Sequence, residues 1–224
     1  MPLVAIGLLL ATLALVLAWT RSRAEQTPEL LRGAERIAIS QYPQGGQKRV
    51  VGTLSMNGEP LVAPLTGRAC AAYEVVVEEA SQDSGTHWTV IAREVRAEPF
   101  IVDDGTGRAF VDPAGATLAI TRDSRSQSGI FKEPDSREAD FLARHGESTK
   151  GTALNRSLRF CEGALELGET VAVLGRGAVS FDDDPTSRSH EGGYRRNSQA
   201  TKIEISAGPR TPVYISDAPF IVDA

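Results

Sequence analysis

The stretch PFIVDDGTGRAFVDP, Pro99 to Pro113, concentrates carboxylates that could bind a metal ion. A calcium loop of the EF-hand type needs oxygen ligands at alternate positions and a glutamate at the twelfth position. Counted from Asp103, the third and fifth positions are glycines and the twelfth is Ala114, so the pattern fails. Asp103 and Asp104 followed by glycines instead predict a tight β-hairpin, because glycine supplies positive φ and aspartate bonds to the local backbone.

Three other side chains could take part in catalysis. Cys70 would be a nucleophile if a histidine base lay beside it, but its alanine neighbours favour a buried, unreactive thiol. Glu162 could act as an acid or base, or it could bond to backbone amides at a strand crossover, and the sequence identifies no partner carboxylate. His145, at the end of an expected helix, is better suited to stabilising that terminus than to coordinating a ligand. These residues favour structural roles over catalytic ones.

The sequence lacks the fingerprints of several functional classes. It contains no Ser-His-Asp signature, P-loop or dinucleotide motif, and it therefore predicts no cofactor. A RING domain needs about eight Cys or His zinc ligands in paired spacings, whereas these 224 residues hold two cysteines, three histidines and no C-x-x-C pair. The net charge of -5 argues against nucleic acid as a partner. Cys70 and Cys161 are expected to be free thiols, although a disulfide between them stays open.

Composition and periodicity predict a mainly β fold, an antiparallel barrel- or sandwich-like domain with one or two short helices. There are 21 glycines and 12 prolines, which favour strands joined by turns. Tyr73 to Glu79 alternates apolar and acidic residues, and His87 to Val95 follows after a polar turn, so the two segments predict an antiparallel hairpin.

Further elements follow from shorter signals. The other expected strands are Arg49 to Leu54, Phe100 to Val102, Ala109 to Val111, Glu169 to Leu174 and Thr201 to Ser206; the expected helices are Thr27 to Ile39 and Asp135 to His145; the expected polar loops are Thr121 to Gly129 and Phe181 to Ala200. Asp135 and Glu138 are spaced as a capping box, and Gly146 follows as a terminator. The pentapeptide PFIVD recurs at Pro219 to Asp223, where it is again typical of a strand.

The amino terminus predicts a membrane anchor. Leu3 to Trp19 is a run of seventeen residues without a charge, which as a helix would span roughly 25 Å. Trp19 ends the run where an interfacial aromatic residue belongs, and Arg21 and Arg23 follow. A cleaved signal peptide would need basic residues before the apolar run, and only Met1 and Pro2 stand there. We therefore expect a single-pass protein with an anchor at 1–23, a juxtamembrane linker at 24–48 and a β domain at 49–224.

Four pieces of the sequence, in fixed order, resemble one family. They are APLTGRACAAYEVVV (Ala63 to Val77), PFIVDDGTGRAFVDPAGA (Pro99 to Ala116), RFCEGALELGETVAVLG (Arg159 to Gly175) and PVYISD (Pro212 to Asp217). Together they resemble the beside-a-membrane, or GIDE-type, domain, which occurs in the mitochondrion-anchored RING-type E3 ubiquitin ligase and in prokaryotic membrane proteins. The family-motif positions of possible functional weight are Cys70, Tyr73, Asp103, Asp104 and Glu162.

The resemblance implies a membrane-proximal domain that binds an unidentified protein or small-molecule ligand. Ligase activity does not carry over, because the second transmembrane helix and the RING of the full ligase are missing from these residues. The expected role is therefore non-catalytic, as a sensor or effector module. The alternative is an anchored component of a RING-type system whose catalytic domain is on another chain. Arg21 and Arg23 place the domain in the cytoplasm, whereas the mitochondrial relatives imply the opposite side.

Overall fold

Five strands close a barrel. The computed structural model describes residues 27–224 apart from 82–86, 130, 150–155, 182–200 and 210. The barrel strands are β1 (Gln47–Met56), β5 (Phe100–Asp103), β6 (Arg108–Val111), β11 (Thr201–Ser206) and β10 (Thr170–Phe181). They pair in that order, and β10 then pairs with β1 to complete the ring. Only β6 and β11 run parallel within it. In chain order, β1, β5, β6, β10 and β11 are the first to fifth barrel strands. Around the barrel the fifth strand therefore lies between the third and the fourth, which is the topology of an OB-fold barrel.

Alternation along these strands fills the barrel with aliphatic side chains. Val50 and Leu54 of β1 and Val171 and Val173 of β10 are at most 1% exposed and belong to one buried cluster with Phe100 of β5. Two short strands, β12 (Tyr214–Ser216) and β7 (Thr117–Ala119), extend the sheet beyond β10. The predicted mainly β class, with a closed barrel, is confirmed.

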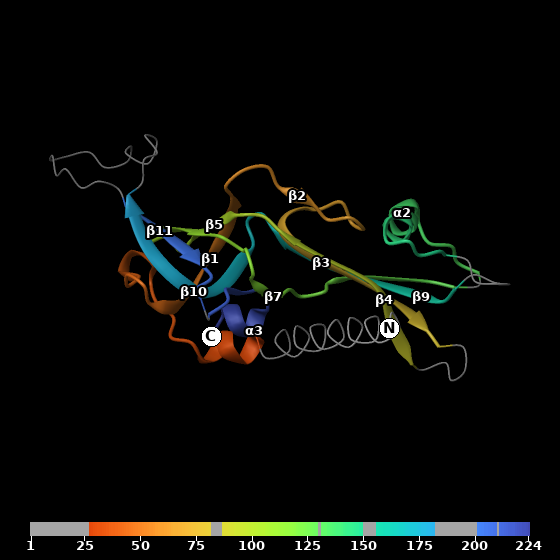
Figure 1. Ribbon diagram of the computed structural model, residues 1–224, viewed down its shortest axis with the longest axis horizontal. Coiled ribbons are helices and arrows are strands. Elements are labelled where there is room, and N and C mark those ends of the chain that lie inside the picture. Colours follow the sequence, from red (N-terminus) through yellow and green to blue (C-terminus); the bar gives the residue numbers. More distant parts are fainter. Residues whose placement is uncertain (1–26, 82–86, 130, 150–155, 182–200, 210) are drawn as a thin grey trace, which may run out of the picture.

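A second sheet extends from the barrel (Figure 1). Its central strands are β3 (Ala69–Ala80) and β9 (Leu158–Glu166); β4 (Trp88–Ala97) and β2 (Leu61–Val62) pair with β3, and β8 (Ser124–Ser128) pairs with β9. This sheet is assembled from two excursions of the chain, because β2 to β4 are inserted between β1 and β5, and β8 and β9 between β6 and β10. The predicted β3–β4 hairpin is confirmed, with Tyr73 opposite Arg96.

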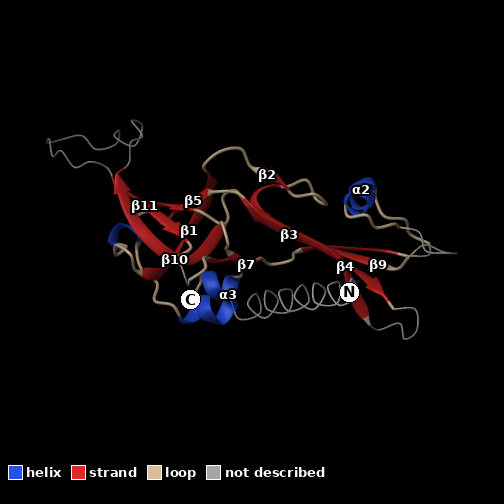
Figure 2. Ribbon diagram, viewed as in Figure 1, coloured by secondary structure: helices blue, strands red, loops and turns tan. Residues whose placement is uncertain are grey.

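One helix packs on the second sheet. In α2 (Ser136–Arg144), the Asp135 side chain accepts from the Glu138 amide, and the Glu138 side chain accepts from the Asp135 amide. This is the predicted capping box, and Gly146 follows the helix with a φ of 72°. Phe141 and Leu142 are fully buried against the sheet. Figure 2 shows the helix lying across one face of the strands.

The residues before β1 pack on the barrel. Residues 27–33 are helical, and a 3-10 turn, η1 (Ile39–Gln41), follows. The helix predicted from Thr27 to Ile39 therefore ends early, near the glycine that weakens it. Tyr42 is 5% exposed, and its hydroxyl lies 2.9 Å from the Lys48 carbonyl oxygen and 2.8 Å from that of Gly175. Part of the expected linker is thus fixed to the barrel wall.

Two local predictions are wrong, and one strand was not anticipated. The expected loop from Thr121 to Gly129 contains β8, a polar strand that forms because β9 offers it a free edge. Strand β9 itself was not predicted. The PFIVD segment at Pro219–Asp223 is not extended: α3 (Pro219–Val222) is helical, with proline at its first turn.

Two further predictions fall on undescribed residues. The membrane helix at Leu3 to Trp19 lies outside the described residues, as does nearly all of the polar excursion from Phe181 to Ala200. None of the helices in the described ranges has the length and apolar character that crossing a bilayer requires.

Candidate functional site

A fully buried carboxylate lies at the centre of the second sheet. Glu162 of β9 is 0% exposed, and its oxygens accept hydrogen bonds from the backbone amides of Leu65 at 2.7 Å and Thr66 at 3.2 Å. The Thr66 hydroxyl donates to the same carboxylate. Of the two roles considered for Glu162, bonding to backbone amides is the one the structure contains. The carboxylate holds the turn between β2 and β3.

The turn held by Glu162 also depends on a glycine. Gly67 has a φ of 76°, and a Cβ there would lie 2.5 Å from the Arg137 guanidinium of α2. The P-L-T-G-R part of the motif is therefore packed between β9 and α2, which explains its threonine and glycine in structural terms.

Arg68 joins this turn to three carboxylates. Its guanidinium binds Asp123 through two hydrogen bonds, at 2.6 and 2.9 Å, and Glu166 through one at 2.8 Å. Glu162 lies 3.8 Å away. The hydrogen bonds from Arg68 hold the pKa of Asp123 below its usual value. Arg68 was not singled out from the sequence, although it stands inside the quoted motif.

The same region carries excess negative charge. Burial raises the pKa values of Glu169 and Asp217, and neighbouring carboxylates raise them further. Their oxygens accept from backbone amides, Glu169 from Glu166 at 2.8 Å and Asp217 from Thr121 at 2.7 Å. Among the described residues, no group of three or more His, Cys, Asp or Glu side chains is arranged to hold a metal ion. These carboxylates fix loops.

Cys70 lies beside Glu162 but lacks the environment of a nucleophile. Its thiol is fully buried, and its Sγ lies 3.8 Å from the Leu61 carbonyl oxygen. Burial, followed by the Glu162 charge, raises the pKa of Cys70 to about 11. The charged groups that influence this thiol are Glu162, Glu166 and Arg68. A neutral, desolvated thiol without a base is unreactive.

The two cysteines do not form a disulfide. Both are free and buried. Cys161 stands opposite Val76 in the β3–β9 register, whereas Cys70 stands opposite Glu166. The six-residue offset along β3 separates them by roughly 20 Å at the strand rise of about 3.3 Å per residue, far beyond disulfide geometry.

Tyr73 takes part in a separate contact with α2. Its hydroxyl donates to Glu94 of β4, and burial together with this bond raises its pKa to about 12. The other Glu94 oxygen lies 3.3 Å from Nε2 of His145, while Nδ1 of His145 lies 2.9 Å from the Phe141 carbonyl oxygen. Tyr73 and His145 thus attach the helix terminus to the sheet.

Asp103 and Asp104 lie in the β5–β6 turn of the barrel, apart from the other motif positions. Asp103 accepts from the Gly105 amide at 2.8 Å. Asp104 accepts from the amides of Thr106 and Gly107 and, at 2.8 Å, from that of Ile39. Although partial burial opposes it, this bonding holds the pKa of Asp104 below its usual value. The predicted hairpin is present, and Asp104 also ties it to η1.

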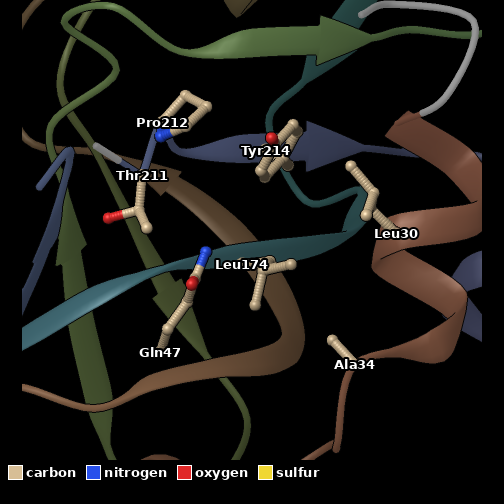
Figure 3. A pocket seen from close by; sticks show the side chains of 7 residues that line it. All are labelled: Leu30, Ala34, Gln47, Leu174, Thr211, Pro212 and Tyr214. Carbon is tan, nitrogen blue, oxygen red and sulfur yellow. The ribbon is translucent and has the colours of Figure 1, made fainter.

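A groove lies where the helical residues 27–33 meet the barrel (Figure 3). Its volume is about 300 Å³. Leu30 and Ala34 line one side, and Leu174 and Tyr214 line the barrel side; Gln47, Thr211 and Pro212 complete it. Leu30 is 47% exposed. Most of the lining residues are apolar, and Gln47, Thr211 and Tyr214 supply polar groups, a composition common in binding sites.

We predict that Glu162→Gln lowers the free energy of unfolding by about 2–4 kcal/mol, because the amide group of glutamine cannot accept from both backbone donors and leaves a buried N–H unpaired. Urea unfolding followed by circular dichroism measures the change. Glu166→Gln is the matched control, because this carboxylate also pairs with Arg68 but is 41% exposed. We expect the substitution to lower the free energy of unfolding by less than about 1 kcal/mol. Equal stability of Glu162→Gln and wild type would contradict the structural role.

We predict that Cys70 resists iodoacetamide in the folded protein. Because burial raises the pKa of Cys70 to about 11, its thiolate fraction at pH 8 is about a hundredfold lower than that of an ordinary solvent-exposed thiol. Mass spectrometry of the labelled peptide should show little modification of Cys70 in buffer and full modification in urea. Rapid labelling in buffer, with the fold intact, would show a reactive nucleophile.

The comparisons with known proteins give one match. The family model described as GIDE, E3 ubiquitin ligase, matches residues 73–193, just over half of the chain. The matched range contains Tyr73, Asp103, Asp104 and Glu162 and begins three residues after Cys70. Neither a curated protein nor a solved structure gives a significant match.

Proposed function

The chain belongs to the GIDE family, and from that premise we propose that it is a non-catalytic binding module held at a membrane by Leu3 to Trp19. The proposal rests on one observation: the motif side chains are buried or hydrogen-bonded to neighbouring segments of the same chain. Cys70 and Glu162 have no exposed surface, whereas a catalytic group must touch its substrate. Asp104 and Tyr73 are likewise bonded to neighbouring segments.

The groove of Figure 3 is the proposed site for a partner. Its volume of about 300 Å³ suits one or two apolar side chains of a protein segment, and Gln47 and Thr211 can bond to that segment's backbone. Leu30 is 47% exposed at the groove. The helical residues that line it follow the predicted anchor closely in sequence, so the groove would be presented near the bilayer.

The alternative function is an anchored component of a RING-type ubiquitin ligase system with its catalytic domain on another chain. The description of the family model favours it. Both proposed functions use the same groove, and they differ in the protein that binds there. A RING-bearing protein in the groove would favour the alternative, and a partner without ligase activity would favour the sensor or effector role.

We predict that a photo-cross-linking amino acid at Leu30 captures a discrete partner in the membranes of the native host, since this side chain lies in the groove. Adducts are resolved by electrophoresis and identified by mass spectrometry. The same amino acid at Glu59, an exposed position in the β1–β2 connection, is the control. The binding role fails if both positions give the same adducts or neither gives any.

We predict that the intact chain stays in the membrane pellet after alkaline carbonate washing and that Leu9→Asp with Leu15→Asp releases it. Each aspartate near the centre of a membrane helix costs about 3 kcal/mol on the insertion scale. Val62→Asp with Leu167→Asp makes the same change at exposed positions of the folded domain and should leave the chain in the pellet. Release of the wild-type chain by carbonate would argue against anchoring.

A further inference from the structure

The two faces of the second sheet differ in what covers them. α2 lies on one face, where Phe141 and Leu142 are buried. Residues paired across antiparallel strands project to the same side of a sheet, so the β3–β4, β3–β9 and β8–β9 registers define the residues of the opposite face. We call this surface, together with Arg122 beside it, the arginine face: Trp88, Val90, Arg93 and Val95 of β4, Arg159 of β9, Arg125 of β8 and Arg122.

The charges of this face are layered, with carboxylates beneath and cations outermost. Glu74 is 6% exposed and binds both Arg93 and Arg122. Glu78 binds Arg159 at 2.6 Å. Arg125 is exposed and has no ion pair in the described part of the chain. Four arginines against two glutamates leave a surplus of positive charge, on a protein whose net charge is -5.

Apolar side chains stand among these cations. Val90 and Val95 are 45% and 44% exposed, and the Arg159 guanidinium lies 4.5 Å from the centre of the Trp88 ring. Beyond the row that contains Trp88, β8 ends in a tight turn in which Gly129 and Lys132 exchange backbone hydrogen bonds. Phe131 in that turn is 101% exposed. The end of the sheet remote from the barrel therefore displays aromatic and basic side chains together.

We infer that the arginine face, with Phe131 and Lys132 at its end, binds the headgroups of anionic lipids. A lipid surface offers phosphates to the arginines and an apolar layer to the valines, Trp88 and Phe131. An acidic peptide would satisfy the charges but leave the exposed apolar side chains in water. A broad sheet face can also contact a bilayer surface over its whole area, whereas an extended peptide would cover only part of it. The contact is attractive because the sign of its charge is opposite to that of the bilayer surface.

This inference rests on the proposed anchoring. A few surplus cations bind an anionic bilayer only weakly when a protein is free in solution. An anchor on the same chain raises the effective concentration of the face at the membrane, so that a weak contact becomes populated. The consequence is a domain that lies against the bilayer when anionic lipids are present and stands away from it when they are absent.

The test measures the distance of Trp88 from lipid headgroups in the full chain. Trp19→Phe leaves Trp88 as the only tryptophan, and the protein is reconstituted in vesicles of phosphatidylcholine, with or without phosphatidylglycerol, that contain a headgroup spin label. We expect Trp88 emission to be quenched in the anionic vesicles and to recover at high salt, since screening weakens surface electrostatics. Flotation of the same vesicles after carbonate treatment reports the anchor separately.

Two double variants provide the matched comparison. Arg125→Glu with Lys132→Glu reverses charge on the proposed surface and should reduce quenching to the level seen in neutral vesicles. Arg96→Glu with Arg144→Glu makes the same charge change on the α2 side, where both side chains are more than half exposed, and should leave quenching unchanged. Both variants must keep the circular dichroism spectrum of the parent.

Five results would overturn the inference. Quenching that is equal in neutral and anionic vesicles, or equal in the two variants, would show that the arginines do not select the lipid. If the chain floats with the vesicles but Trp88 is not quenched, the arginine face does not bind lipid, although the anchor does. If the chain does not float, both the anchoring and the lipid binding are rejected. A response of Trp88 to polyglutamate in solution, without quenching in anionic vesicles, would identify an acidic protein segment instead.

Discussion

The buried charge of Glu162 is the constraint on which the second sheet depends. An ionised carboxylate inside a sheet is costly to desolvate, and it is tolerated only where donors surround it. Here the donors come from the β2–β3 turn. That turn then directs Arg68 toward Asp123 ahead of β8 and toward Glu166 at the end of β9. The β2–β3 turn of the first excursion is therefore fixed to β9 of the second, in addition to the backbone pairing of β3 with β9.

The arrangement separates a stable framework from surfaces that are free to bind. The barrel and the second sheet use the polar residues of the motifs internally, as ligands for backbone amides and as ion pairs. The features left open are of another kind: an apolar groove beside residues 27–33 and a cationic sheet face remote from the barrel. Both features are surfaces of the folded domain, and neither uses the polar motif side chains that hold the framework together.

Local signals in the sequence predicted local structure well. The Asp135–Glu138 capping box marked α2, and alternation from Tyr73 to Glu79 marked β3. The pentapeptide PFIVD shows the limit, since it is a strand at β5 and a helix at α3. At β5 the segment has neighbours on both sides that complete its hydrogen bonds. At α3 no such edge receives it, and Ile221 is buried by packing against β10.

Longer-range features of the site could not be read from the chain. Strand β8 is polar, and only β9 makes it a strand. The parallel pairing of β6 with β11 joins segments about ninety residues apart, and no spacing rule anticipates it. The arginine face was hidden because its members come from three strands, and register rather than sequence places them on one surface. Glu162 was recognised as a backbone ligand in principle, but the turn that it binds lies ninety-six residues earlier.

The construction of the second sheet from two insertions also has a mechanical meaning. A single hairpin would be joined to the barrel by only two chain segments. Here four segments connect the second sheet to the barrel. In addition, β3 is hydrogen-bonded to β9 along most of its length. With twelve residues, β3 is roughly 40 Å long at the usual strand rise. The continuous pairing of β3 with β9 opposes bending of the sheet, so the end that carries Phe131 is held in a defined orientation relative to the barrel.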